Sequence, residues 1–201
     1  QNGRLDDYGL GAIVGTSHWS GTPTPTVYLN NTFMRHNFAL VNGAAVQMNS
    51  GSLVLEDSTF ESNEAALGGA VLAMGGAQVA VVGTTTFRDN TAAPREVNSG
   101  GGAFYLSSST LVVDGDTSKL VIENNQAPQG AGMMVSDSVM IVSGGAEFQC
   151  NNNVVTSDLR AGGCMFVQKL LQRNTISVTG IGTRVKINGN QAYRGAGVSL
   201  I

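Results

Sequence analysis

Short runs of alternating apolar and polar residues recur along the chain, and glycine-rich turns separate them. The clearest runs are rich in β-branched residues and lie at 27–29, 53–55, 79–82, 111–113, 139–142 and 176–178. Alternation with a period of two is typical of β-strands, whereas helices repeat their apolar positions every three to four residues. The glycines would also interrupt any longer helix. The pattern therefore predicts an all-β chain of short strands.

An apolar residue followed by asparagine three positions later recurs through these runs. The pairs are Phe60 and Asn63, Phe87 and Asn90, Ile122 and Asn125, Phe148 and Asn151, and Ile187 and Asn190, while Phe33 and Asn37 form a version with one extra residue. A fixed motif that returns at intervals of this order is typical of a repeat protein, in which each repeat is one supersecondary unit.

A second motif, three small residues ahead of an apolar one, returns with the same rhythm. Its copies lie at 43–46, 68–71, 101–104, 130–133, 162–165 and 195–198, and a partial copy begins near Leu10. Together with the β-branched runs, the two motifs give three strands in each repeat. We predict a right-handed parallel β-helix with three short strands per coil and about six to seven coils. Residues 1–201 would form a single domain, with a Thr/Pro-rich corner loop at 15–26.

The asparagine motif has a structural explanation. Its first residue is expected to point inward, so that Phe33, Phe60, Phe87, Ile122, Phe148 and Ile187 stack in one interior row. An asparagine amide both donates and accepts, and a column of amides can satisfy backbone groups at a corner. The expected column contains Asn63, Asn90, Asn125, Asn151 and Asn190.

Strand parity also predicts an apolar outer surface. If the residue after each small triplet points inward, the next residue points outward, which exposes Leu72, Tyr105, Met134 and Phe166. The β-branched strand would likewise expose Tyr28, Val54, Val112 and Met140. Large apolar patches usually mark contact surfaces, so we expect these residues to form an interface with another copy, a neighbouring domain or a host receptor. A register slip by one residue would bury Tyr105 and Phe166 instead.

The small triplet followed by an aliphatic residue, paired with Phe-x-x-Asn, resembles the repeat of the chlamydial polymorphic outer membrane proteins. Related β-helix surface proteins of other bacteria and microbial eukaryotes share it. The resemblance covers about residues 9 to 201. It implies a secreted chain displayed at the cell surface, with a structural or adhesive role.

Composition limits the possible partners. The chain has a formal net charge of −3 and only 12% charged residues, so no basic stripe is available to neutralise nucleic acid. No run of apolar residues is long enough to cross a membrane as a helix. Strand edges at the ends of a solenoid tend to aggregate when they are open. We therefore expect the chain to be a segment of a longer one or a subunit of an assembly.

Many parallel β-helices act on polysaccharides, and this is the alternative function. Glycoside chemistry requires two carboxylates across a cleft, and lyase chemistry requires clustered acids with a nearby base. The close acidic pairs are Asp6 with Asp7, Glu56 with Asp57, and Asp114 with Asp116, and all fall near turns. Asp commonly satisfies backbone donors in turns. We therefore expect a scaffold rather than an enzyme, with no cofactor and no metal site.

Two further features concern covalent modification. Cys150 and Cys164 both occupy repeat positions of one coil, where they could form a disulfide in an oxidising compartment or remain as two buried thiols. The Asn30-Asn31-Thr32 sequence is an acceptor for N-linked glycans in a eukaryotic secreted protein. Both features agree with an extracellular location.

Overall fold

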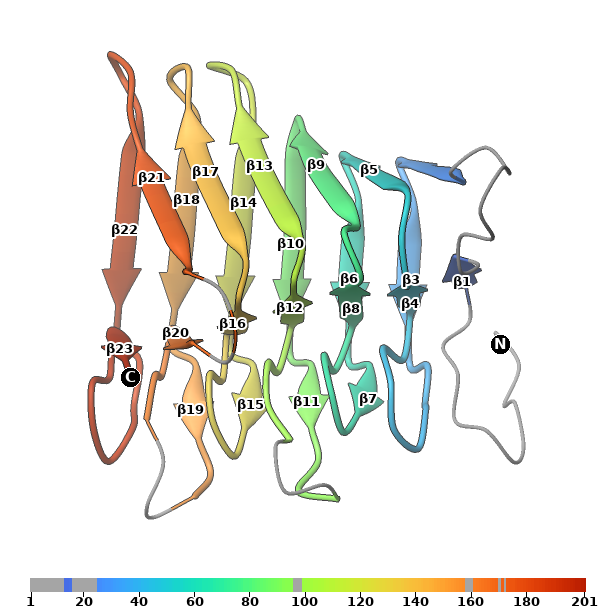
Figure 1. Cartoon of the computed structure of the whole chain (residues 1–201), viewed down its shortest axis with the longest axis vertical. Helices are drawn as coiled ribbons and strands as arrows, with labels where there is room; N and C mark the ends of the chain where they lie inside the picture. Colours follow the sequence, from blue (N-terminus) through green and yellow to red (C-terminus); the bar gives the residue numbers. More distant parts are fainter. Residues whose placement is uncertain (1–12, 16–24, 96–98, 158–160, 170, 172) are drawn as a thin grey trace.

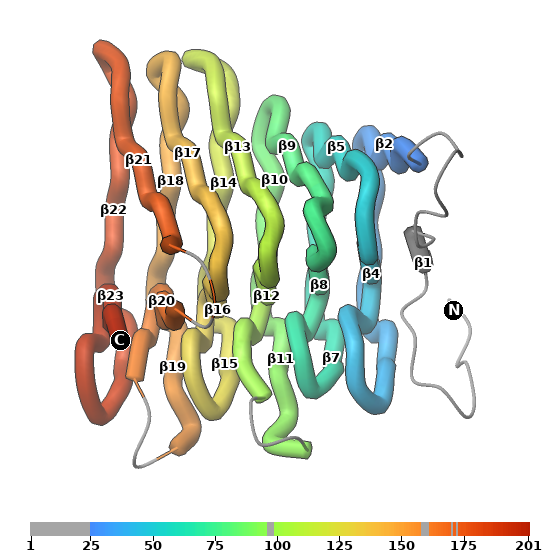
Figure 2. Tube along the Cα trace, in the orientation of Figure 1, coloured from blue at the N-terminus to red at the C-terminus, as the bar shows by residue number. Residues whose placement is uncertain are grey.

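The chain forms a parallel β-solenoid of about six coils, without helices in the part that the structure describes (Figure 1). This computed structural model describes residues 13–15, 25–95, 99–157, 161–169, 171 and 173–201. Figure 2 shows that the coils lie side by side in sequence order, so that each contacts mainly its neighbours. The prediction of an all-β solenoid is confirmed. The prediction of a 15–26 corner loop falls mostly outside the described residues.

Three sheets run along the solenoid, and every strand pair in them is parallel. Sheet A follows the small triplets and contains β1 (Ile13–Gly15), β4 (Val46–Met48), β8 (Val71–Met74), β12 (Phe104–Ser107), β16 (Met133–Ser136), β20 (Met165–Gln168) and β23 (Val198–Leu200). Sheet B contains the β-branched runs, namely β2 (Thr26–Asn30), β5 (Ser52–Glu56), β9 (Gln78–Val82), β13 (Thr110–Asp114), β17 (Val139–Ser143) and β21 (Thr175–Val178).

Sheet C carries the asparagine motif. Its strands are β3 (Phe33–Arg35), β6 (Thr59–Glu61), β10 (Thr84–Arg88), β14 (Lys119–Glu123), β18 (Glu147–Asn151) and β22 (Arg184–Asn188). A fourth row of two-residue strands follows the asparagines at the corner between sheets C and A. This row, sheet D, contains β7 (Glu64–Ala65), β11 (Thr91–Ala92), β15 (Gln126–Ala127) and β19 (Val154–Val155).

The interior row of sheet C differs from the predicted one at two coils. Strand register aligns Met34, Phe60, Phe87, Ile122, Cys150 and Ile187. Phe33 was predicted to lie in this row, but it points outward and is 48% exposed. Phe148 is buried, yet it lies two residues earlier, in the row of Leu120 and Val185. The prediction was wrong at these two coils because it placed a phenylalanine in the row. Met34 and Cys150 occupy these positions instead.

The asparagine column is continuous through six coils, and one predicted member is wrong. Its members are Asn37, Asn63, Asn90, Asn125, Asn153 and Asn190. Each backbone N–H and each Nδ2 donates to the Oδ1 of the next asparagine along the chain. Asn151 was predicted for this column, but it is the last residue of β18 and lies opposite Asn188 on the outer side.

The residue before each column asparagine adopts a left-handed conformation. These residues are His36, Ser62, Asp89, Asn124, Asn152 and Gly189, with φ between 53° and 63°. Only glycine adopts this region freely, and Asn and Asp are the most tolerant of the other residues. The turn directs the following asparagine back into the stack, which is why the column stays in register although coil length varies from 26 to 37 residues.

Glycine in the small triplets is required by close backbone contacts. Gly101 has a φ of 68°, and a Cβ there would collide with the carbonyl oxygen of Phe104. Behind this corner the main core is filled by residues of all three sheets, and the rings of Phe60 and Phe87 stack with centroids 4.5 Å apart. The small triplets therefore allow the chain to bend sharply into sheet A while the next residue enters the core.

Candidate functional site

The last coil that the structure describes contains a cavity lined almost entirely by apolar side chains. Strands β21, β22 and β23 are the last described members of their sheets. Ile176 continues the row of the buried Met140, and Val198 continues the row of the buried Met165. Ile176 is 40% exposed and Val198 is 39% exposed.

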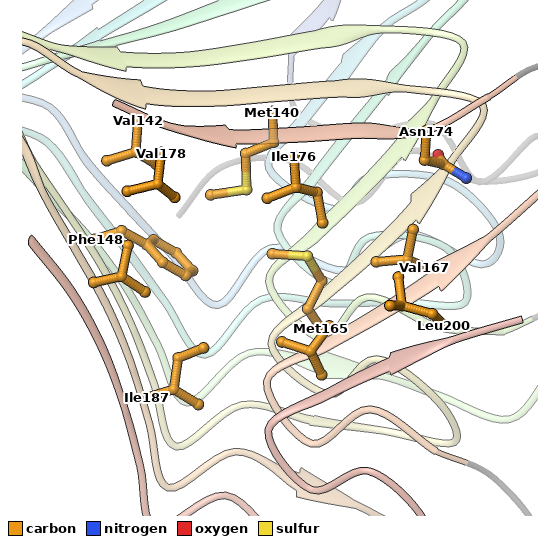
Figure 3. A pocket seen from close by; sticks show the side chains of 12 residues that line it. Met140, Val142, Phe148, Met165, Val167, Asn174, Ile176, Val178, Ile187 and Leu200 are labelled. Carbon is orange, nitrogen blue, oxygen red and sulfur yellow. The ribbon is translucent and has the colours of Figure 1, made fainter. Parts of the chain in front are cut away.

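A cavity of about 270 Å³ opens at this end, inside the last coil (Figure 3). Side chains from β17, β18, β20, β21, β22 and β23 converge on it, and nearly all are apolar. Figure 3 shows Met140, Phe148 and Met165 at its base and Asn174 as the polar group at its rim. Asn174 is already engaged, since its Nδ2 donates to the carbonyl of Gln168 and its Oδ1 accepts from the N–H of Ser138. The cavity can bind apolar groups, but no titratable residue lines it.

The asparagine column ends at both sides with unused hydrogen-bonding capacity. Asn190 accepts from Asn153 through its Oδ1 and donates its Nδ2 to the carbonyl of Cys150, 2.8 Å away. Its backbone N–H has no acceptor among the described residues, because the next asparagine of the column would supply it. The Oδ1 of Asn37 is buried and has no donor among the described residues. Throughout the described column, the donors face the following coil and the acceptors face the preceding one.

The prediction of an exposed apolar interface on sheet A is wrong. Leu72, Tyr105, Met134 and Phe166 do point away from the main core, but they are buried in a second apolar cluster. Residues of the corner segments, including Leu67 and Ala161, pack against them. Burial raises the pKa of the Tyr105 hydroxyl, and the nearby Asp137 carboxylate raises it further. Strand parity was correct, but it could not show that the corner segments fold back over this face.

The predicted interface on sheet B is correct in direction except at one coil. Tyr28, Val54 and Val112 lie in the outer row, and Tyr28 is 57% exposed while the other two are half-buried. Met140 was predicted to lie in this row but points into the main core, and Ile141 takes the outer position. Val139 pairs with Thr110, the first residue of β13, so Met140 takes the interior position that Leu111 has in the preceding coil.

The two cysteines form a disulfide inside the core. Cys150 occupies the interior row of sheet C, and Cys164 replaces the alanine of a small triplet. Their Cα atoms are 5.7 Å apart, and 14 residues separate them in the sequence. The bond links the end of sheet C to the start of sheet A in one coil. Of the two alternatives left open by the sequence, the structure contains the disulfide.

A polar groove runs across the turns that join sheets B and C. It has a volume of about 300 Å³, and Thr84, Asp116, Lys119, Glu147 and Arg184 contribute to its walls. A single residue, Gly83, joins β9 to β10, whereas the next three turns are longer and project further, as Figure 1 shows. The step between the short turn and the long ones creates the groove.

Charged side chains of successive coils line up beside this groove. Lys119, Glu147 and Arg184 occupy one register position on β14, β18 and β22. The insertions between coils hide this alignment in the sequence. Hydrogen bonds from Lys186 and then Gln149 lower the pKa of Glu147 from its ordinary 4.5 to about 2. Glu147 therefore remains ionised and bound to Lys186, which disfavours a role as a proton donor.

The glycan acceptor Asn30 lies at the exposed end of β2. Its Nδ2 donates to the Glu56 carboxylate at 2.9 Å, and the Tyr28 hydroxyl donates to the same carboxylate. Asn31 follows in a left-handed conformation, with a φ of 47°. The side-chain amide is thus at the surface in a turn, where an enzyme could reach it.

The described residues contain neither a metal-binding cluster nor a membrane-spanning helix. No group of three or more His, Cys, Asp or Glu is placed to hold a metal ion. No helix in the part of the chain that the structure describes is long and apolar enough to span a membrane.

Comparisons of the chain with protein-family models, curated proteins and solved structures found no match. The fold itself therefore defines the class of protein: a parallel β-solenoid with an internal asparagine ladder.

Proposed function

We propose that this chain is an extracellular structural or adhesive β-solenoid, which builds a surface scaffold by association with its neighbours. The observation that carries the proposal is the apolar outer row of sheet B, where Tyr28 is 57% exposed and Val54 and Val112 are half-buried. Apolar side chains gathered on one outer face usually mark a contact with a partner. Association through this row would remove these side chains from water.

Three other features support an extracellular surface location. The internal disulfide favours an oxidising compartment, because such bonds are rare in reducing cellular compartments. The repeat also resembles that of the chlamydial polymorphic outer membrane proteins, which implies display at a cell surface. The exposed glycan acceptor Asn30 agrees with secretion in a eukaryotic host.

Sedimentation velocity over a range of protein concentrations tests the proposal. We expect the purified chain to self-associate and Val112→Asp to reduce association, because a charge would then lie in the apolar outer row of sheet B. Leu40→Asp is the matched control, since Leu40 is also an exposed apolar residue but lies outside sheet B. A chain that stays monomeric at all concentrations, or equal effects of the two variants, would contradict the proposal.

The polar groove favours a second candidate function, the binding of an acidic polysaccharide. Lys119 and Arg184 flank it, and hydroxyl groups of Thr84 and Thr117 could bind sugar hydroxyls. Titration calorimetry with uronate oligosaccharides would test this function. Arg184→Ala should abolish binding, whereas Arg95→Ala, on a distant corner, should not. Release of shortened products would instead support a polysaccharide-degrading enzyme.

A further inference from the structure

We propose that the outer face of sheet B binds the same face of a second copy of this chain, with the coils of the two copies running in the same order. This inference rests on the proposed function and adds the partner and the symmetry of the contact. It follows from the chemistry of the three rows of side chains that point outward from sheet B.

The middle row of this face is apolar through five coils. Strand register places its members side by side, and they are Tyr28, Val54, Ala80, Val112 and Ile141. Tyr28 is exposed, and the other four are half-buried. An equal apolar row of a second copy would cover all five side chains at once.

The two rows that flank the apolar one differ in chemistry. The first residues of the strands form one of them and include no charged side chain: Thr26, Ser52, Gln78, Thr110, Val139 and Thr175. The last residues of β2, β5, β9, β13 and β17 form the other: Asn30, Glu56, Val82, Asp114 and Ser143. One side of the apolar row therefore carries mainly hydroxyl donors, and the other side carries two carboxylates.

A two-fold axis parallel to the solenoid axis makes these rows complementary. Each strand of sheet B then lies across from the same strand of the second copy in the opposite direction, so the apolar row faces itself and each flanking row faces the other. Ser52 lies opposite Glu56, and Thr110 lies opposite Asp114. A carboxylate accepts several hydrogen bonds, so Glu56 can accept one from the second copy besides those that it receives from Tyr28 and Asn30. Each contact occurs twice, as in any isologous interface.

The competing two-fold arrangement has its axis along the strands. To cover the apolar row, this axis must pass through β9 in the middle of the five coils, and each flanking row then faces itself with the coil order reversed. Glu56 would lie opposite Asp114 of the second copy, and like charges across an interface are unfavourable. The proposed pair avoids this repulsion. It also sets equivalent coils side by side, so that both copies can be held from the same side of a surface.

Cross-linking tests the geometry of the contact. Sheets that pack face to face are about 10 Å apart, which is beyond the reach of a disulfide, so a short bis-maleimide reagent is required. Gln78 and Val82 are exposed at opposite ends of β9, about 13 Å apart. We expect a mixture of Gln78→Cys and Val82→Cys to give a cross-linked dimer and each variant alone to give little. Ala80→Cys should cross-link to itself, because the apolar row faces itself. The native cysteines are bonded to each other and do not react.

A reversal of charge tests which rows face each other. Thr110→Asp places a second carboxylate opposite Asp114 and should weaken self-association by about tenfold or more, whereas Thr110→Lys should strengthen it. Thr86→Asp is the matched control, since Thr86 is also a half-buried threonine but lies on the outer side of sheet C. Sedimentation velocity would measure association, and circular dichroism would show that each variant is folded.

The results separate this inference from the proposed function. Cross-linking of Val82→Cys to itself without the mixed product would show that the flanking rows face themselves, and it would overturn the inference. Equal effects of Thr110→Asp and Thr86→Asp would also overturn it. If Val112→Asp weakened association but none of the three cysteine variants could be cross-linked, sheet B would bind a different surface, and only the proposed function would stand. A monomer at every concentration would overturn both.

Discussion

The Oδ1 of Asn153 accepts two hydrogen bonds from Asn125, one from the backbone N–H at 2.9 Å and one from Nδ2 at 3.0 Å. Asn125 also donates to the carbonyls of Phe87 and Glu123. One buried side chain therefore joins three successive coils at the corner between sheets C and A. The same arrangement recurs in the neighbouring coils, so buried asparagine side chains link the coils along this corner.

Substitution of an asparagine in the ladder should destabilise the fold strongly. Substitution of Asn151, which was wrongly predicted to lie in the ladder, should not. Asn125→Ala leaves the buried donors of Asn90 without an acceptor, so we expect a loss of about 2 to 3 kcal/mol in the free energy of unfolding. Asn151→Ala, at the outer row, should change it by less than about 0.5 kcal/mol. Urea denaturation would measure both, and similar losses would refute the assignment of Asn153 to the ladder.

The interior aromatic row gives a second contrast. Phe87 stacks on Phe60 and contacts the ring of Phe104, with centroids 4.5 and 4.4 Å apart. Phe87→Ala should therefore reduce stability by about 3 to 5 kcal/mol. Phe33→Ala removes an exposed ring of the first coil and should cost less than about 1 kcal/mol. An unchanged thermal midpoint for Phe87→Ala would be incompatible with the observed register.

Phe166 tests whether the outer face of sheet A is covered. Phe166→Asp would bury a carboxylate within an apolar cluster, and we expect it to unfold the chain or destabilise it by more than about 3 kcal/mol. Tyr28→Asp, at an exposed outer position of sheet B, should have little effect on stability. Circular dichroism during thermal unfolding would compare the stability of the two variants. A stable Phe166→Asp protein with altered assembly would restore the original interface prediction.

Reduction of the disulfide should loosen the coil that contains it. Closing a loop of this size stabilises a protein by roughly 3 kcal/mol through the entropy of the unfolded chain. We expect a reductant, or the paired change of Cys150 and Cys164 to Ala, to lower the thermal midpoint. Mass spectrometry after alkylation in denaturant, without reductant, should find no modified cysteine. Two alkylated thiols in freshly secreted protein would contradict this expectation.

The Glu147 and Lys186 pair should make stability depend on acidity. Because the pKa of Glu147 is lower in the folded chain, the pair stabilises the fold fully above pH 4.5 and ceases to do so as the pH falls towards 2. Lys186 is about half exposed, so the contribution should stay below about 1 kcal/mol. Glu147→Gln and Lys186→Met should each flatten the pH dependence of stability in this window. If both variants kept the full pH dependence of stability, other groups would be responsible for it.

The sequence was sufficient to predict the solenoid, because spacing and turn chemistry repeat in every coil. The position of single residues was less certain where the repeat uses an unusual side chain. Met34 and Cys150 replace the expected aromatic, and the left-handed residues His36 and Asn152 would have identified the correct asparagines. Cys150, which precedes Asn151, is a poor candidate for a left-handed turn.

The candidate sites were harder to predict than the fold. The apolar cavity depends on side chains from several strands, and the polar groove depends on turns of different length that lie side by side only in the folded chain. The cover over Leu72 and Phe166 comes from corner segments without a repeated motif. Parity along a strand gives the direction of a side chain, but it does not show what packs on top of it.

The stacking of coils in sequence order also determines how the molecule should respond to force. A pull on the last described coil would detach β23, β22 and β21 one after another, because among the described residues each of these strands pairs only with the strand of the preceding coil. The chain should lengthen in steps of one coil, with 26 to 37 residues released each time. At roughly 3.4 Å per extended residue, each step would add about 90 to 125 Å. The disulfide would stop part of this extension until it is reduced, so the molecule would act as a tether with a redox-sensitive length.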